Sequence, residues 1–212
     1  MAALSDLTAA VAAGQRPETI RLTQELLAAG TLPQDVVERG LVPGMAIVGE
    51  RFRRNEIFVP EMLIAARAMK EALKILEPLL VAAGIQPKYT AVIGTAQGDL
   101  HDIGKNLVAI LWRGANFKVI DLGTNVSAER YIAAAREHQA HLVGISALLT
   151  TTMPAMKEAV IALKAAGLTG TKVVIGGAPV TQDFANEIGA DGFAPDAGTA
   201  VELARRLMGE TT

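Results

Sequence analysis

The sequence predicts two domains, an N-terminal all-α four-helix bundle and a C-terminal α/β domain built on a parallel sheet of about five strands. Up to residue 86 the apolar residues recur at helical spacing, whereas from residue 87 short β-branched runs alternate with amphipathic segments. The stretch Gly84-Ile85-Gln86-Pro87 separates the two patterns. We therefore expect domains at residues 1–86 and 87–212.

The first domain contains four segments with helical periodicity, at residues 4–13, 17–29, 34–54 and 60–83. Pro17 and Pro60 suit the first turn of a helix, and Gly30 suits a helix stop. We expect Pro43-Gly44 to interrupt the third segment. Four such helices can bury their apolar faces as a small bundle.

The second domain alternates strands with helices along the chain. Strands are predicted at 90–94, 118–122, 142–146 and 172–175, with a weak fifth near 192–193, and helices at 103–114, 128–138, 153–166, 182–188 and 199–208. This alternation indicates a doubly wound parallel sheet, for which we expect a flavodoxin-like, Rossmann-type strand order. Ligands of such sheets bind at the carboxyl ends of the strands, where this chain places its small and polar residues.

Composition excludes several classes of function. The chain has 212 residues, of which 50% are hydrophobic, enough for real cores. A net charge of −2 and an aromatic content of 4% give no reason to expect nucleic acid as a partner. With no cysteine, no long uncharged apolar run and no basic region at the N-terminus, we expect a cytoplasmic protein with no membrane partner.

A histidine follows the first predicted strand, in the stretch Gly98-Asp99-Leu100-His101-Asp102-Ile103-Gly104-Lys105-Asn106. Asp99 is close enough to accept a hydrogen bond from one ring nitrogen and leave the other free to bind a metal. The chain has only two other histidines and no cysteine, so further ligands would have to come with a cofactor. Haem and corrinoid cobalt both need one axial ligand. A plainer alternative is that Asp99 or Asp102 only caps the helix beginning near Ile103.

Asp99, His101 and Gly104 at this spacing resemble the cobalamin-binding signature of corrinoid methyl carriers and of cobalamin-dependent methionine synthase. The resemblance implies a cobalamin or related corrinoid as cofactor, including methylcobalamin and cob(I)alamin. It makes His101 the lower axial ligand of cobalt and Asp99 its hydrogen-bond partner. The cofactor's own nucleotide base would be displaced from cobalt and enter the protein.

The other strand-end loops match the same family. Segment 144–153 resembles the lining of the channel for the displaced nucleotide tail, and its Ser146 would extend the relay from His101 through Asp99. Gly176-Gly177 resembles paired glycines that let the tail run close to the backbone, although such a pair is usually just a tight turn. The cofactor-binding residues implied in this domain are Gly98, Asp99, Leu100, His101, Asp102, Gly104, Ser146, Leu148, Thr150, Gly176, Gly177 and Ala197.

The helical half carries a second resemblance. Segments 41–52 and 58–70 are similar to the cap bundle that covers the upper face of cobalt in this family. By position, Phe52 and Val59 would shield a cobalt-bound methyl group and Glu38 would touch the edge of the corrin ring. Ordinary helix packing is the alternative role for Phe52, Phe58 and Met62.

The resemblance implies a methyl shuttle that is not catalytic alone. The protein would accept a methyl group from a substrate:corrinoid methyltransferase and present it to a corrinoid:acceptor methyltransferase, with an acceptor such as tetrahydrofolate or a thiol, in one-carbon metabolism. His101, Asp99 and Ser146 would carry the change of axial ligation. A reductive activase would be a further partner.

Three other functions remain as alternatives. A phosphate-binding loop needs four residues between its glycines, whereas five separate Gly98 from Gly104, and Asn106 stands where that motif has Ser or Thr. A cobalamin-binding sensor or cofactor-handling module would share the histidine motif without turning over a methyl group. A cobalamin-dependent mutase subunit would share the α/β half but pair it with a substrate barrel instead of a helical cap.

Overall fold

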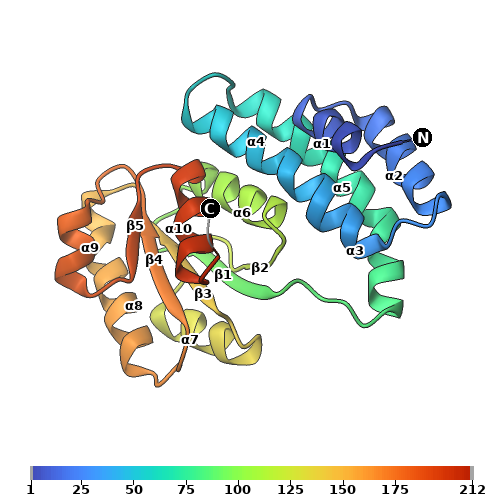
Figure 1. The fold of residues 1–212 in the computed structure, drawn as a ribbon. Coiled ribbons are helices and arrows are strands. Elements are labelled where there is room, and N and C mark those ends of the chain that lie inside the picture. The colour runs from blue at the N-terminus through green and yellow to red at the C-terminus, as the bar shows by residue number, and fades with distance from the viewer. Residues whose placement is uncertain (1, 211–212) are drawn as a thin grey trace. The chain divides into compact units, whose positions relative to one another are not determined.

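The computed structural model describes residues 2–210. Contacts divide the chain into two compact units, one formed by residues up to Lys88 together with Arg113–Asn116, and the other by Tyr89–Trp112 and the residues from Phe117 on. Figure 1 shows helices alone in the first unit and a sheet between helices in the second. The predicted fold class is confirmed for both units.

The helical unit consists of α1 (Leu4–Ala12), α2 (Arg16–Ala28), the short α3 (Pro33–Asp35), the π-helical turn η1 (Val36–Leu41), α4 (Val42–Arg53) and α5 (Val59–Ala82). Helix α2 packs on α5, and α1 packs on η1 and α4. Pro60 lies in the first turn of α5, where Glu61 Oε2 accepts a hydrogen bond from the Phe58 backbone N–H at 3.0 Å. This contact satisfies a donor that a helix start leaves unpaired.

The expected interruption at Pro43-Gly44 is wrong. Helical backbone passes through this point by widening to the π-helical turn, in which the Val42 N–H reaches Val37 O. Pro43 then opens α4, a first-turn position that tolerates its missing N–H. Gly44 is needed for close packing on α1, because a Cβ there would lie 2.7 Å from Val11 and 2.9 Å from Thr8 O.

The α/β unit contains β1 (Tyr89–Thr95), α6 (Ile103–Gly114), β2 (Phe117–Asp121), α7 (Ala128–Glu137), β3 (Leu142–Ser146), η2 (Thr150–Thr152), α8 (Met153–Ala165), β4 (Lys172–Gly176), α9 (Gln182–Ile188), β5 (Gly192–Ala194) and α10 (Ala197–Leu207). The five strands are parallel in the order β2-β1-β3-β4-β5, as expected. The order reverses direction between β1 and β3, so the loops after these two strands flank the point where such sheets bind ligands.

The two faces of the sheet have different surroundings. Val92, Val143 and Val173 belong to a hydrophobic core with residues of α7, α8 and α9. The next residues along these strands, Ile93, Gly144 and Val174, are paired in one row across the sheet and line a cavity on the other face, bounded by α6 and α10. Side chains alternate along a strand, which explains the division.

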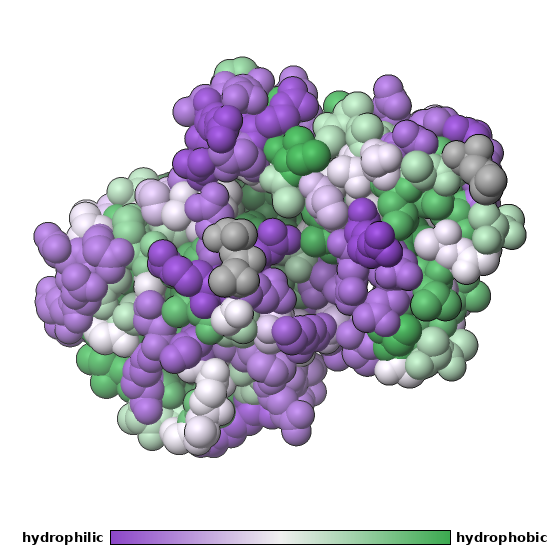
Figure 2. All heavy atoms as spheres, in the orientation of Figure 1, coloured by the Kyte–Doolittle hydropathy of each residue, from purple (hydrophilic) through white to green (hydrophobic). Residues whose placement is uncertain are grey.

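The visible surface mixes polar and apolar residues. Figure 2 shows apolar side chains on the helical unit among hydrophilic ones, and its large exposed hydrophobic residues include Leu32, Phe58, Ile64 and Val81. Within residues 2–210, no helix is long and apolar enough to cross a membrane.

Candidate functional site

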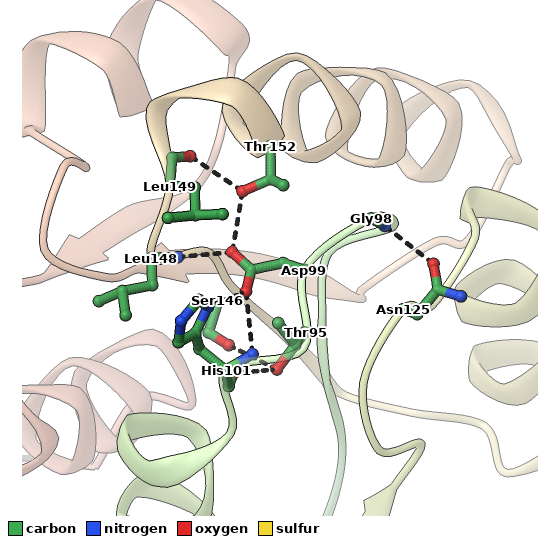
Figure 3. A network of polar contacts seen from close by, with 9 residues as sticks. All are labelled: Thr95, Gly98, Asp99, His101, Asn125, Ser146, Leu148, Leu149 and Thr152. Atoms are coloured by element: carbon green, nitrogen blue, oxygen red, sulfur yellow. Dashed lines mark hydrogen bonds and ion pairs between the residues drawn. The ribbon is translucent and has the colours of Figure 1, made fainter.

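Two hydrogen bonds join the loop after β1 to the loop after β2. Gly98 has a φ of +83°, in the left-handed region that favours glycine, and its N–H donates to Asn125 Oδ1 at 2.8 Å. The Asn125 N–H in turn donates to Asp99 O at 3.0 Å. These contacts fix the backbone at the point where Asp99 turns inward, as Figure 3 shows.

Asp99 holds His101 through one carboxylate oxygen. Asp99 Oδ1 accepts the His101 backbone N–H at 3.0 Å and lies 2.8 Å from His101 Nδ1. The Asp99 side chain is fully buried, whereas half of the His101 side chain is exposed. The imidazole is therefore anchored from below and open on its outer side.

The second carboxylate oxygen of Asp99 accepts hydrogen bonds from the loop after β3. The Leu148 N–H and the Thr152 hydroxyl each lie 2.8 Å from Oδ2. Burial opposes ionisation of Asp99, but the hydrogen bonds from His101, Leu148 and Thr152 outweigh it and hold the pKa of this carboxyl well below its usual range. Asp99 is thus a carboxylate at neutral pH.

An ionised Asp99 settles which nitrogen of His101 is free. A carboxylate only accepts hydrogen bonds, so Nδ1 carries the proton of the 2.8 Å contact, and in the neutral imidazole Nε2 then has the free lone pair. No group of three or more His, Cys, Asp or Glu side chains among residues 2–210 could hold a metal ion. A single basic imidazole nitrogen fits a metal that brings its own equatorial ligands, as the cobalt of a corrinoid does.

The Ser146 hydroxyl is hydrogen-bonded to Thr95 and not to Asp99, which corrects the expected relay. Its hydroxyl lies 3.1 Å from Thr95 Oγ1, and Thr95 donates its own proton to His101 O at 3.0 Å. Thr95 and Ser146 are paired across β1 and β3, so their side chains meet on one face of the sheet. The hydroxyl at Asp99 belongs to Thr152 in the loop beyond.

A cavity of about 590 Å³ opens beside His101 at the carboxyl ends of the strands. Among the residues expected to bind the cofactor, its lining includes Leu100, His101, Asp102, Gly104, Ser146, Leu148, Gly176, Gly177 and Ala197. Asp99 lies buried beneath His101, and Gly98 and Thr150 are absent from the lining. Leu100, Ile103 and Leu148 expose large apolar side chains at this cavity, which suits a ligand with an extensive apolar surface.

Close backbone contacts within the chain explain why glycine occupies both positions 176 and 177, at the end of β4. A Cβ on Gly177 would lie 1.8 Å from Ala147 O, and one on Gly176 would lie 2.8 Å from Ala194 O. Gly177 also has a φ of +132°. The pair therefore lets the backbone ends of β3, β4 and β5 come together and at the same time lines the cavity.

Each charged residue near the cavity has a polar partner within the chain. Buried Lys105 places Nζ 2.6 Å from both carboxylate oxygens of Asp121. Asp102 accepts a hydrogen bond from the Asn106 side-chain amide at 3.0 Å. Asp196 caps α10 through Thr199. With these charges satisfied locally, the cavity suits a large, mostly uncharged ligand.

The sequence-based prediction missed several residues of this site. Thr152 ends a run of three threonines just before α8, which was the available signal for a hydroxyl there. Asn125 has a φ of +53°, a conformation that asparagine tolerates and that commonly marks a tight turn. Thr95, Lys105 and Trp112 had no comparable signal, because their partners Ser146, Asp121 and Ala200 are distant in the sequence.

The three expected contacts of the helical unit lie in η1, α4 and α5. Phe52 is in the last turn of α4 and Val59 is the first residue of α5, so a short connection separates them. Glu38 is exposed in η1 and accepts a hydrogen bond from the Gln34 amide at 3.0 Å.

Comparison with known proteins assigns the family. A B12 binding domain model matches residues 89–204, and a second B12 binding domain model matches residues 3–77. The chain is 42% identical over 214 residues to a corrinoid protein of Desulfitobacterium hafniense, covering 99% of each chain. It is 42% identical over 187 residues to trimethylamine corrinoid protein 1 of Methanosarcina mazei, covering 87% of each.

Solved structures show the same architecture. The chain matches one in the methanol:cobalamin methyltransferase complex of Methanosarcina barkeri with a TM-score of 0.86 and 31% identity, covering 99% of this chain and 80% of that one. It matches a cobalamin-binding protein of Desulfitobacterium hafniense with a TM-score of 0.82 and 30% identity, covering 98% and 99%. The predicted cofactor class, a cobalamin or related corrinoid, is confirmed, and this chain belongs to the family of corrinoid proteins of methyltransferase systems.

Proposed function

We propose that this protein carries a methyl group on a bound corrinoid from a substrate-specific methyltransferase to an acceptor methyltransferase. When bound, the corrinoid supplies a cobalt centre that accepts a methyl group at one axial position and gives it up again. The observation that carries the proposal is the half-exposed imidazole of His101, anchored by buried Asp99 at an apolar cavity.

His101 is the proposed lower axial ligand, through Nε2. Asp99 keeps the proton on Nδ1 and so leaves the Nε2 lone pair available, and a hydrogen bond of this kind makes a ligating imidazole more basic. Thr152 and the Leu148 N–H keep Asp99 ionised. Ser146 is a proposed contact of the cofactor at the rim, with Thr95 as its own partner.

The cavity beside His101 is the proposed place for the nucleotide tail of the cofactor. Most of its lining is apolar, and its polar side chains are those of His101, Asp102, Lys105, Ser146 and Asp196. Leu148, Gly176, Gly177 and Ala197 would contact the tail, and Leu100, Asp102 and Gly104 the region around cobalt. For Gly98 we propose the supporting role seen in its contact with Asn125, and for Thr150 the cofactor contact rests on the family resemblance alone.

The helical domain, residues 1–86, is the proposed cap over the methyl-bearing face. Phe52 and Val59 would exclude water from that face, and Glu38 would meet the edge of the ring. A cap of this kind has to open for each partner, because the methyl group enters and leaves on the covered face.

The proposed partners are a substrate:corrinoid methyltransferase, a corrinoid:acceptor methyltransferase and a reductive activase. Relatives are named dimethylamine and trimethylamine corrinoid proteins, and a structural relative lies in a methanol:cobalamin methyltransferase complex. Methylated amines and methanol are therefore the first donors to test. We propose one-carbon metabolism in the cytoplasm as the setting, with a folate or thiol as acceptor.

The axial assignment is tested with the purified full chain loaded with hydroxocobalamin. The absorption spectrum should show a cofactor whose own base is displaced, and His101→Ala should lose the imidazole-bound spectrum. His138→Ala, at the end of α7, serves as the matched control and should keep it. An unchanged spectrum in His101→Ala would contradict the assignment of the axial ligand.

Methyl transfer then tests the carrier role. Loaded and reduced protein is mixed with methyltransferases for methanol, methylamines or methoxyaromatic compounds, and methylation of the cofactor is followed by absorbance. We expect one donor enzyme to methylate it and an acceptor enzyme to remove the methyl group. Corrinoid binding without methylation by any donor system would instead support a sensor or cofactor-handling role.

A further inference from the structure

The inner end of the cavity beside His101 is closed by an aromatic side chain. Trp112 lines the same cavity as His101 but lies nine residues after Ile103, the first residue of α6. At about 1.5 Å per residue, this places it about 13 Å along the helix from the rim. Trp112 is therefore at the far end from the axial histidine.

The indole of Trp112 is held in place on three sides. Its Nε1–H donates to Ala200 O of α10 at 3.1 Å, and its ring stacks on Phe117 with a centroid distance of 6.3 Å. Its third neighbour is Gly144 in β3, where a Cβ would lie only 2.7 Å from the indole. The side chain is 1% exposed, so it has no room to move outward.

Gly144 and Trp112 together set how far the cavity extends. Gly144 sits in the row formed with Ile93 and Val174, and it is the only one of these three positions that lacks a side chain. The space above it is filled by the indole that crosses from α6 to α10. The floor is thus a fixed aromatic surface, while the rim above includes the exposed apolar side chains of Leu100, Ile103 and Leu148.

On the proposed function, this cavity takes the nucleotide tail, and its inner end takes the base that terminates the tail. We propose that Trp112 is the specificity-determining residue for that base, because the fixed indole limits the size of the base that fits. The indole Nε1–H is already used by Ala200 O, so the selection is steric and apolar. In an apolar pocket, one methylene group more or less changes affinity by about tenfold or more.

The test compares two corrinoids that differ only at the proposed contact. Cobalamin carries 5,6-dimethylbenzimidazole, and its benzimidazole analogue lacks the two methyl groups. Their dissociation constants are measured by ultrafiltration and absorbance for wild-type protein, Trp112→Phe and Gly144→Ala. Cobinamide, which has no nucleotide tail, reports whether the His101 end of each variant remains intact.

We expect Trp112→Phe to shift the affinity ratio about tenfold toward the dimethylated base, since a smaller ring deepens the cavity. Gly144→Ala should shift the ratio the other way, because its new methyl group forces the indole into the cavity. The double variant should remove the effect of Gly144→Ala. Tyr131→Phe, a buried aromatic residue in the core on the opposite face of the sheet, is the matched control and should leave the ratio unchanged.

Three results would overturn the inference. An unchanged ratio in Trp112→Phe, with cobinamide binding intact, would show that the floor does not select the base. An equal loss of affinity for both cobalamins and for cobinamide would show a merely structural role. Wild-type protein that binds none of the three corrinoids would overturn the proposed function together with this inference, so the two failures are distinguishable.

Discussion

His101 and Asp99 are joined by two hydrogen bonds to the same oxygen. Asp99 Oδ1 accepts the backbone N–H of His101 at 3.0 Å and lies 2.8 Å from its ring Nδ1. The backbone contact fixes the position of His101, and the ring contact fixes its tautomer and the direction of its free nitrogen. One buried carboxylate therefore both positions and tunes the proposed axial ligand.

Thr152 is expected to support this carboxylate through its hydroxyl. Thr152→Val keeps the shape but removes the 2.8 Å hydrogen bond to Asp99 Oδ2, which should destabilise the protein by about 1–3 kcal/mol and raise the pKa of Asp99. Urea unfolding measures the free energy. Thr152→Ser retains the donor and should recover most of the loss, so equal stability of the two variants would contradict this role.

The stability of the protein should depend on pH through Asp99. Its pKa is lower in the folded protein than in the unfolded chain, where an aspartate has a pKa of about 3.9. The stabilisation is therefore fully present above the unfolded value and is lost as pH falls through it toward the folded pKa.

We expect the difference in unfolding free energy between wild type and Asp99→Asn to be constant between about pH 5.5 and 7, and to shrink below about pH 4. Urea unfolding across this range measures it. Asp102→Asn makes the same change at an exposed neighbouring carboxylate, which accepts a hydrogen bond from the Asn106 side-chain amide, and so controls for the loss of charge. If the difference in unfolding free energy grew as the pH falls, the expected direction of the pH dependence would be wrong.

Gly177 should not tolerate a side chain. In Gly177→Ala the new Cβ would lie 1.8 Å from Ala147 O at a φ of +132°, so clash and backbone strain together should cost about 3 kcal/mol or more. Gly189→Ala has a φ of +77° but no atom within 4 Å of its Cβ, so it isolates the cost of strain alone. Thermal unfolding compares the two, and similar losses would mean that the close approach is unimportant.

Phe52 is expected to protect the cofactor from the cap side. Phe52→Ala should increase the rate at which light demethylates bound methylcobalamin, because the removed ring would otherwise confine the methyl radical. Absorbance during illumination measures the rate. Phe58→Ala, a highly exposed phenylalanine just before α5, is the control, and a rate in Phe52→Ala no faster than in the control would argue against the contact.

Local sequence patterns were enough to predict the two-domain architecture and the pair Asp99 and His101 at the centre of the site. Periodicities of 3.6 and 2 residues depend only on neighbouring positions, so they revealed the helices, the strands and the faces they bury. Asp99 and His101 lie two residues apart, so the hydrogen bond between them could be predicted from the local sequence. Pro43 shows the limit of local reasoning, because a widened helical turn placed it at the start of α4 instead of at a break.

The distant residues that complete the site become evident once the chain is folded. Thr152 reaches Asp99 across 53 positions, Asn125 reaches Gly98 across 27, and Trp112 reaches Ala200 across 88. These contacts depend on the order of the strands and on the path of each loop after its strand, which hydrophobic periodicity does not encode. For this reason the sequence-based prediction gave Ser146, and not Thr152, as the partner of Asp99. The pairing of β1 with β3 directs the Ser146 hydroxyl toward Thr95, and the hydroxyl that bonds Asp99 comes from Thr152, after β3.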